Sequence, residues 1–319
     1  MNYRTIENMN DLIQKNINNF HGFDLIVGIP RSGMLPASII SLKVNASLCS
    51  LDEYISNSVL KSGITGRHKS KFETAHDVKK VLVVDDSIQS GRSMEDAKSK
   101  IPLELRKNCK FCVIFGTKIA PEGLVDFSLE RVERPRVFEW NIFHHSTLSS
   151  SCVDIDGVLC DDIDRSDDDD GVEYIKKLAE VNAYIKPTKE IDTLVTNRLE
   201  KYRKETEQWL DANSIKYKCL IMNPAKTAEE RRALNNYSKH KAKAYIESNN
   251  LLFIESSKRQ SIEIANISGK PVICTDDNSI NYPGVLNSIS KKSGLTYILK
   301  KALFRNQLFM NFYRKWKNK

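Results

Sequence analysis

The N-terminal half of the chain is organised around the segment Val81-Leu82-Val83-Val84-Asp85-Asp86-Ser87-Ile88-Gln89-Ser90-Gly91-Arg92-Ser93-Met94. Four consecutive aliphatic residues, mostly β-branched, predict a strand that is buried on both faces, as in the interior of a parallel sheet. Two carboxylates end this strand, a turn rich in Ser and Gly follows, and a helix is predicted to begin near Met94. This order predicts an α/β domain whose ligand crevice lies beyond the carboxyl ends of its strands.

The turn after Asp86 has the composition of a phosphate-binding loop. Its backbone N–H groups, with a helix N-terminus behind them, favour an anion, and Gly91 permits a close approach of the chain. Three serines add hydroxyl donors: Ser87, Ser90 and Ser93. Because carboxylates repel phosphate, Asp85 and Asp86 are expected to face hydroxyl groups or a metal ion. A sugar diol on the acids and a phosphate on the loop describe a ribose 5-phosphate.

The whole string resembles the signature of the type I phosphoribosyltransferases that binds 5-phosphoribosyl 1-pyrophosphate (PRPP), with Ser where this family often has Thr. The resemblance implies that Asp85 and Asp86 act in binding and transfer of the phosphoribosyl group. It also assigns PRPP binding to the loop residues Ser87, Ile88, Gln89, Ser90, Gly91, Arg92 and Ser93.

A second buried strand is predicted from Asp24 to Ile29, followed by Pro30-Arg31-Ser32-Gly33 and a helix that begins near Leu35. On the residues alone, a simple surface turn is an alternative for this loop. The resemblance assigns Arg31, Ser32 and Gly33 to the pyrophosphate-binding loop, where Arg31 stabilises the charge on the departing pyrophosphate.

Residues 56–77 form a polar segment rich in Ser, Gly, Lys and His, too long for an ordinary connection. The resemblance implies a mobile loop that closes over PRPP and excludes water, while a flexible hairpin is the alternative. Further strands are predicted at Phe111–Phe115 and Leu124–Leu129, and Arg134–Trp140 is expected to pack its aromatic residues. Nothing in this half identifies the acceptor of the phosphoribosyl group.

A second domain is predicted to begin after the small-residue bridge 146–151, with Val153-Asp154-Ile155-Asp156-Gly157-Val158-Leu159. Two acids spaced two apart at a strand end can point the same way. The pattern resembles the haloacid dehalogenase phosphatases. The resemblance makes Asp154 the nucleophile on phosphorus and Asp156 the acid that protonates the leaving oxygen, with Mg²⁺ required.

Three further positions follow the order of that family. Thr196 ends a strand and would hold the phosphoryl oxygen, and Lys241 would neutralise charge, with Lys239 and Lys243 as rivals. Glu255 ends the last strand. Two serines, Ser256 and Ser257, follow where a second acid is usual. The implied metal shell is Asp154, the Asp156 carbonyl, Glu255 and water.

The stretch between Asp156 and Thr196 is short, so any cap over this site is small. An open site of this kind suits a bulky substrate. The acidic run Asp161–Asp170 is interpreted as a solvated loop. Three histidines are expected to be surface or packing residues: His144, His145 and His240.

The 319 residues carry 49 Lys and Arg against 41 Asp and Glu. Nine of the basic residues and no acidic one fall between Lys291 and Lys319, so the remainder is balanced and is not predicted to bind nucleic acid. Within this tail Leu295–Trp316 has the apolar spacing of an amphipathic helix, which suits an anionic membrane surface; docking on the protein itself or on a dimer partner is the alternative.

Seven scattered cysteines, including a Cys109–Cys112 pair interpreted as core thiols, predict a reducing compartment. No apolar leader or membrane-spanning run is found, so a cytoplasmic location is expected, at most peripheral at the inner face of the membrane. The expected organisation is α/β with two Rossmann-like parallel-sheet domains, 1–146 and 147–288, and a basic tail, 289–319.

Together the two halves resemble fused proteins that use PRPP to install ribofuranose in bacterial polysaccharides. The expectation is transfer of 5-phosphoribose to a carbohydrate acceptor, a lipid-linked glycan, followed by removal of the 5-phosphate. Two alternatives stay open. One is nucleobase salvage with a nucleotide phosphatase, and the other is a PRPP-sensing regulator that does not catalyse.

Overall fold

The computed structural model describes residues 1–61, 70–163 and 170–284. The chain forms two compact units, which divide between Asn141 and Ile142, slightly before the expected boundary at residue 146. The acidic run is described only at its ends. The central part of the 56–77 loop and the basic tail lie outside the described residues.

The first unit is a five-stranded parallel sheet in the order β3-β2-β4-β5-β6. Its strands are β2 (Leu25–Gly28), β3 (Ser47–Ser50), β4 (Val81–Ser87), β5 (Cys109–Gly116) and β6 (Phe127–Arg131). The predicted buried strand at Val81 is confirmed, and it extends through both aspartates. The last strand begins slightly later than expected, at Phe127.

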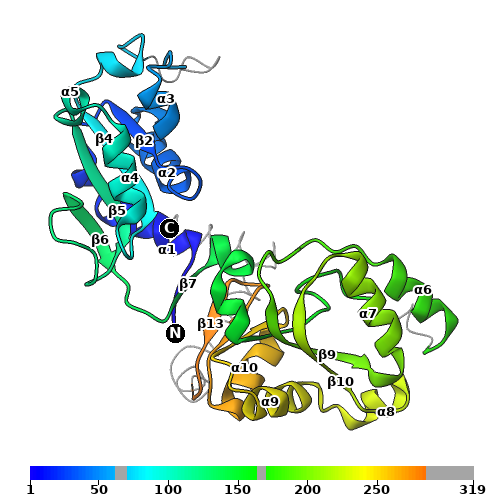
Figure 1. The fold of residues 1–319 in the computed structure, drawn as a ribbon. Helices are drawn as coiled ribbons and strands as arrows, with labels where there is room; N and C mark the ends of the chain where they lie inside the picture. Colours follow the sequence, from blue (N-terminus) through cyan, green and yellow to red (C-terminus); the bar gives the residue numbers. More distant parts are fainter. Residues whose placement is uncertain (62–69, 164–169, 285–319) are drawn as a thin grey trace, which may run out of the picture. The chain divides into compact units, whose positions relative to one another are not determined.

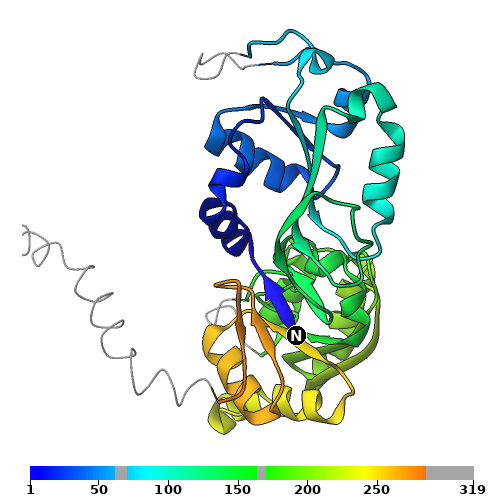
Figure 2. The same ribbon diagram turned by 90° about the vertical axis from the view of Figure 1, so that its left-hand side faces the viewer.

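Alternate residues of β4 enter two separate cores because successive side chains of a strand point to opposite faces. Val81 and Val83 pack with α4 (Arg92–Lys100). Leu82 and Val84 pack with α1 (Ile6–Lys15) and α2 (Met34–Val44). Helices therefore cover both faces of the sheet, which Figures 1 and 2 show as blue helices on one side and the blue-green α4 on the other.

The helices that follow β2 and β4 leave on opposite faces, so the crevice between these two strand ends is the topological switch point of the sheet. Both predicted loops lie there. The remaining elements of this unit are β1 (Asn2–Arg4), η1 (Ile17–Asn19), α3 (Leu51–Ile55), η2 (Ala75–Asp77), α5 (Leu103–Arg106) and β7 (Arg136–Phe138). The strands β1 and β7 pair in parallel. The segment η3 (Glu139–His144) spans the division between the units.

The second unit is a six-stranded sheet in the order β10-β9-β8-β11-β12-β13, parallel except for β13. Its strands are β8 (Ser151–Val153), β9 (Ile191–Leu199), β10 (Tyr217–Asn223), β11 (Leu252–Glu255), β12 (Val272–Cys274) and β13 (Ser279–Asn281). Its helical segments are η4 (Ser146–Ser150), α6 (Val172–Glu180), η6 (Glu200–Tyr202), α7 (Arg203–Ala212), α8 (Ala228–Leu234), α9 (Tyr237–Glu247) and α10 (Lys258–Ser268).

The first strand of this unit, β8, lies between β9 and β11, so its carboxyl end is again a switch point. The helices α9 and α10 pack side by side on one face, over a core that includes Tyr245 and Phe253. Figure 1 shows α6 and α7 on the opposite side of β9. The α/β class with parallel sheets is thereby confirmed for both units.

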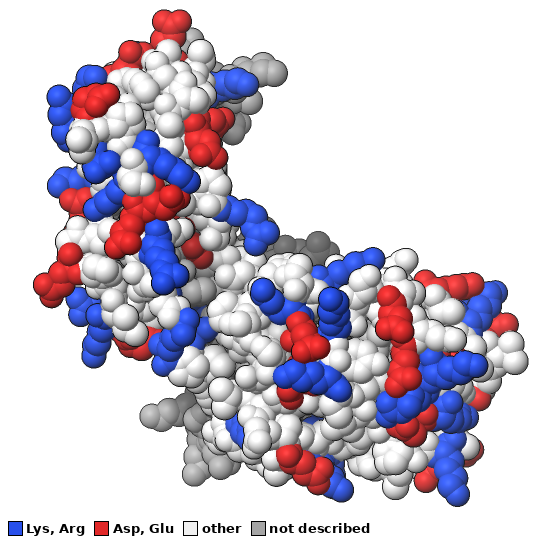
Figure 3. Space-filling view, in the orientation of Figure 1, with Lys and Arg blue, Asp and Glu red and all other residues white. Residues whose placement is uncertain are grey.

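All seven cysteines are free and six of them are buried, in agreement with the prediction of core thiols at Cys109 and Cys112. Within the part of the chain that the structure describes, no helix has the length and apolarity needed to cross a bilayer. On the face drawn in Figure 3, basic and acidic side chains are interspersed over both units.

The close approach of Gly33 to the sheet generates a first prediction. A Cβ atom at this position would lie 2.5 Å from the Ile29 carbonyl oxygen and 2.7 Å from that of Val84. Because both are backbone atoms of the sheet edge, Gly33→Ala is expected to lower the free energy of unfolding by about 3 kcal/mol, measured by urea denaturation.

The control is Gly123→Ala, where nothing lies within 4 Å of the added atom although φ is +75°. That change should cost only about 1 kcal/mol of backbone strain. Equal losses in the two variants would show that the packing of Gly33 on the sheet edge is not a constraint.

Candidate functional site

In the first unit, the two predicted loops meet at Asp86. The Ser32 hydroxyl donates to Oδ1 of Asp86 at 2.9 Å, and the Trp140 indole Nε1–H donates to Oδ2 at 2.7 Å. The structure therefore brings together Ser32 after β2 and Asp86 at the end of β4. Each carboxylate oxygen retains a further lone pair for a ligand hydroxyl.

Trp140 was not foreseen as a site residue. It stacks on Phe138, with ring centroids 4.8 Å apart, as expected for a packing aromatic, but its indole N–H also orients Asp86. A buried indole N–H usually has a hydrogen-bond acceptor, so the presence of a Trp in this segment was the only indication of such a contact in the sequence.

Asp85 lies next to Asp86 but is held differently. Its Oδ1 accepts the backbone N–H of Asp86 at 2.9 Å. Burial and then the neighbouring Asp86 raise the pKa of Asp85 to about 8. The two acids of the pair therefore have different environments.

The loop after β4 divides into supporting and exposed residues. Ile88 is buried in the core, its N–H donates to the Phe115 carbonyl at 3.0 Å, and its carbonyl accepts from Arg136 at 2.8 Å. Ile88 thus fastens the loop to the sheet rather than facing a ligand with its side chain. Gly91, with φ of +90°, turns the chain into α4, which begins slightly before the expected Met94.

Other predicted residues of this site are accessible. Ser90, Arg92 and Ser93 are exposed at the start of α4, Ser87 is partly buried, and Arg31 is exposed after a cis Pro30–Arg31 peptide bond. The side-chain amide oxygen of Gln89 accepts from Arg134. The edge of the sheet consequently presents hydroxyl groups, main-chain amides and a guanidinium group beside the acid pair.

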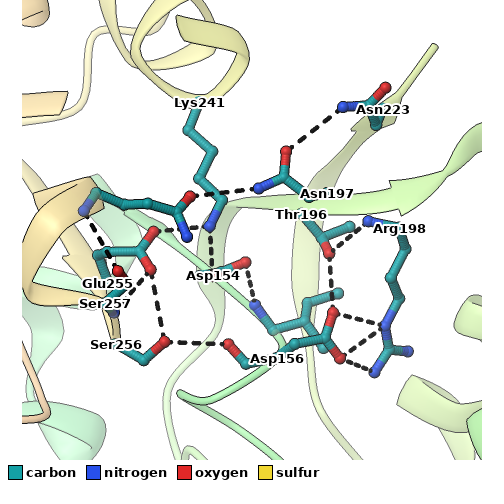
Figure 4. Close-up of polar contacts among 12 residues, drawn as sticks. Asp154, Asp156, Thr196, Asn197, Arg198, Asn223, Lys241, Glu255, Ser256 and Ser257 are labelled. Carbon is teal, nitrogen blue, oxygen red and sulfur yellow. Dashed lines mark hydrogen bonds and ion pairs between the residues drawn. The ribbon is translucent and has the colours of Figure 1, made fainter. Parts of the chain in front are cut away.

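The second unit places three charged groups in one buried cluster at the end of β8. The Lys241 ammonium group from α9 lies 2.6 Å from Oδ2 of Asp154 and 2.7 Å from Oε2 of Glu255 (Figure 4). All three residues are buried. Of the rival lysines, Lys239 is exposed and Lys243 is exposed and pairs with Glu247 at 3.9 Å, so only Lys241 reaches this cluster.

Asp156 lies beside this cluster and is bound by Arg198. The Arg198 Nη2 and Nε atoms are 2.6 and 3.0 Å from Oδ1 of Asp156, and the Thr196 hydroxyl donates to Oδ2 at 3.3 Å. Thr196 and Arg198 are both buried in β9 (Figure 4). The role of Arg198 was not predicted, although a basic residue close to the end of a predicted buried strand was a signal.

The charges in this site shift its pKa values in opposite directions. Burial alone would raise the pKa of Asp156, but Arg198 and then Lys241 hold it below its usual range. Burial raises the pKa of Asp154, Lys241 lowers it, and Glu255 and Asp156 raise it further, so that it lies well above its usual range. Burial would lower the pKa of Lys241, but Asp154 and Glu255 raise it. Among the residues that the structure describes, the site thus holds three carboxyl groups but only two cations that pair with them, Lys241 and Arg198.

The serines after β11 complete the edge. The backbone N–H of Ser257 donates to Oε1 of Glu255 at 3.0 Å, and the Ser256 hydroxyl donates to the Asp156 carbonyl at 3.4 Å. Within the described ranges, no group of three or more His, Cys, Asp or Glu side chains is arranged to hold a metal ion. A cavity of about 270 Å³ opens onto Asp154, Asp156 and Lys241.

Residues 2–148 match the family model described as "Phosphoribosyl transferase domain". The chain is similar to a purine phosphoribosyltransferase from Pyrococcus horikoshii Ot3, with 22% identity over 44% of this chain and 92% of that chain and a TM-score of 0.33. It is also similar to a xanthine-guanine-hypoxanthine phosphoribosyltransferase from Helicobacter pylori, with 18% identity, the same coverage of both chains and a TM-score of 0.32. A hypothetical protein from Neisseria gonorrhoeae with bound ppGpp has 19% identity over 44% and 89% of the two chains and a TM-score of 0.31. No curated protein matches the chain.

The N-terminal half is therefore a phosphoribosyl transferase domain of the type I class, as the Val81–Met94 segment predicted. This domain implies PRPP as substrate. The resemblance of the second half to the haloacid dehalogenase phosphatases stays a prediction.

The burial of Asp85 generates a prediction about pH. A carboxyl whose pKa is raised on folding destabilises the folded state, increasingly as pH rises from about 4, its unfolded value, to about 8. Asp85→Asn removes this effect. The stability of the variant relative to the wild type is expected to grow by roughly 1 kcal/mol per pH unit across this window and to be constant above it. Thermal unfolding of the full chain at several pH values measures the difference, and a difference that does not depend on pH would contradict the assigned environment.

The Lys241 cluster generates a prediction about stability. Lys241→Met leaves Asp154 and Glu255 buried without their cation and is expected to lower the free energy of unfolding by about 3–5 kcal/mol in urea. Lys243→Met, at an exposed position of the same helix, should change it by less than about 0.5 kcal/mol. Similar losses in both variants would mean that the ammonium group of Lys241 does not hold the cluster.

Proposed function

We propose that the chain is a bifunctional enzyme that builds a ribofuranosyl unit on a glycan. The first unit transfers 5-phosphoribose from PRPP to a hydroxyl group of a carbohydrate acceptor. The second unit then hydrolyses the 5-phosphate and leaves a β-ribofuranosyl residue.

In the transfer step, the bond between C1 of PRPP and the pyrophosphate oxygen breaks, and the acceptor oxygen bonds to C1 as its proton leaves. A single inversion of the α-configured donor gives a β product. Asp85 and Asp86 take the ribose hydroxyls, the loop at 87–93 takes the 5-phosphate, and Arg31 stabilises the departing pyrophosphate. The family match and the hydrogen bond between Ser32 and Asp86 support this step.

The observation that carries the second step is the buried cluster of Asp154, Lys241 and Glu255 beside Thr196, open to a cavity at the switch point. In the first half-reaction Oδ of Asp154 attacks phosphorus and the bond to the ribose O5 breaks. In the second, water attacks the aspartyl phosphate and releases inorganic phosphate. Lys241 offsets the charge of both anions, and the Thr196 hydroxyl donates to a phosphoryl oxygen.

Asp156 is proposed as the acid and base of these half-reactions, and Arg198 constrains that role. The lowered pKa keeps Asp156 in the carboxylate form, which can accept a proton from the attacking water. The same lowered pKa opposes the protonation that the leaving O5 requires. A phosphate bound beside Asp156 would raise the pKa of this carboxyl through its negative charge and would so favour the protonated form.

Mg²⁺ is the cofactor that we propose for this site. Asp154, the Asp156 carbonyl and Glu255 would hold it, with water in its other positions. These oxygen donors fit the ion, as does the presence of three carboxyl groups beside two cations, Lys241 and Arg198. When bound, Mg²⁺ screens the repulsion between a carboxylate and a phosphate.

A lipid-linked glycan is the acceptor that we propose, on the resemblance to PRPP-dependent ribofuranosyl-transfer proteins. The basic segment 291–319 would then contact anionic lipid at the inner face of the cytoplasmic membrane. This segment lies outside the described residues, so the proposal rests on its sequence.

The relay makes a prediction about products. Asp154→Asn keeps the size of the side chain but removes the nucleophile. Mass spectrometry after incubation with PRPP, Mg²⁺ and glycolipid acceptors should show a phosphoribosylated product that accumulates with the variant. The intact chain should yield the ribosylated product and free phosphate.

Asp211→Asn, at an exposed position of α7, is the matched control and should behave as the intact chain. Identical products from Asp154→Asn and the intact chain would overturn the relay. A parallel incubation with nucleobases that yields nucleosides instead would establish salvage. If no ribose 5-phosphate ester releases phosphate, the second unit is not a phosphatase.

A further inference from the structure

A second cavity adjoins the one that holds Asp154, and it has no role in the phosphatase chemistry. Its volume is about 590 Å³, within the range of about 300–1,000 Å³ for ligand pockets. It lies between the start of α9 and the outer side of α10. The two cavities share three lining residues, Tyr237, Ser257 and Gln260. A molecule with its phosphate at Asp154 can therefore extend into this groove.

The walls of this α9–α10 groove are tied to each other. The Ser238 hydroxyl on α9 donates to Oε2 of Glu263 on α10 at 2.6 Å, and Arg259 donates to Oε1 of the same carboxylate at 3.0 Å. The amide oxygen of Gln260 accepts from Asn197 of β9 at 3.4 Å. The Ser238–Glu263 bond joins α9 to α10, whereas Arg259 pairs with Glu263 along α10, so the two walls are fixed before a ligand binds.

Besides Lys239 and the ion pair of Arg259 with Glu263, the lining combines neutral polar groups with small apolar surfaces. Asn235 and Gln260 offer amides that both donate and accept, as sugar hydroxyls do. Tyr237 and Ile267 offer apolar surface for the C–H faces of a sugar ring. Lys239 is exposed on the wall and makes no ion pair with the residues that the structure describes, so its ammonium group can meet an anion.

A third cavity, on another side of the proposed phosphate site, is lined by acidic residues. This cavity of about 490 Å³ shares Asp162, Ser256 and Ser257 with the cavity at Asp154 and is also lined by Asp161 and Asp276. Carboxylates there repel a substrate that carries further negative charge. An anionic substrate is therefore directed to the α9–α10 groove.

We propose that this groove binds the sugar residues next to the transferred ribose, in an acceptor that carries negative charge. This inference rests on the proposed function of the second unit and names its substrate subsite. The phosphorylated ribose occupies the cavity at Asp154, and the glycan attached to C1 of the ribose lies across Tyr237 toward Lys239.

The test compares two substrates with defined aglycones. One is methyl 5-phospho-β-ribofuranoside, which fills only the phosphate cavity. The other is a 5-phospho-β-ribofuranosyl hexuronic acid, whose carboxylate reaches the groove. The intact chain is expected to have a higher kcat/KM for the second. Lys239→Glu should lower the ratio of the two kcat/KM values by about tenfold.

Lys243→Glu is the matched control, since it makes the same charge change on the same helix at an exposed position. It should leave that ratio unchanged within about twofold. A ratio that is insensitive to Lys239→Glu, or equally sensitive to Lys243→Glu, overturns the proposal. So does a nucleoside 5′-monophosphate that shows the same dependence on Lys239, because the groove would then accept a base.

Failure of the proposed function is recognised separately. If neither ester is hydrolysed by the intact chain with Mg²⁺, the phosphatase assignment fails. Binding of the hexuronic acid ester, measured by calorimetry, then still tests the groove. Weaker binding to the Lys239→Glu variant than to the Lys243→Glu variant supports it, and equal binding overturns it.

Discussion

The feature on which both halves depend is the burial of carboxylates where a central strand of a parallel sheet ends. Such a group is costly to bury unless donors or cations surround it. The first unit meets this requirement for Asp86 with Ser32 and Trp140. The second meets it with Lys241 for Asp154 and Glu255 and with Arg198 for Asp156. In each case the partners come from other elements, so only the folded unit provides the groups that stabilise the buried carboxylate.

The two units stabilise their buried carboxylates by different means. Neutral donors orient Asp86, so its oxygens can accept hydrogen bonds from sugar hydroxyl groups. Cations offset the charge of Asp154 and Glu255, which would suit the phosphate and the metal ion of the proposed second step. The proposed sequence of transfer and dephosphorylation agrees with this difference. In that proposal, the phosphate is a binding group in the first unit and the reacting group in the second.

Arg198 changes how the second site is understood. With its guanidinium on Asp156, the two aspartates that are spaced two apart do not have equivalent environments. Burial and two neighbouring acids raise the pKa of Asp154, whereas Arg198 lowers that of Asp156 despite its burial. The adjoining cavities add a further asymmetry, since Lys239 lines one of them whereas Asp161 and Asp276 line the other.

The sequence by itself determined the buried strands, the acids that end them and the small turn residues, because hydrophobic runs and turn composition are local properties. It also determined the class of the first unit, through Val81–Met94, and proposed Lys241 before the structure placed it. Only the tertiary structure decided that Trp140 and Arg198 hold carboxylates, that Ile88 faces the core, and that the cavity at Asp154 adjoins a groove. These facts depend on which strands lie side by side and which helix faces which strand. Residue spacing along a chain contains no such distances.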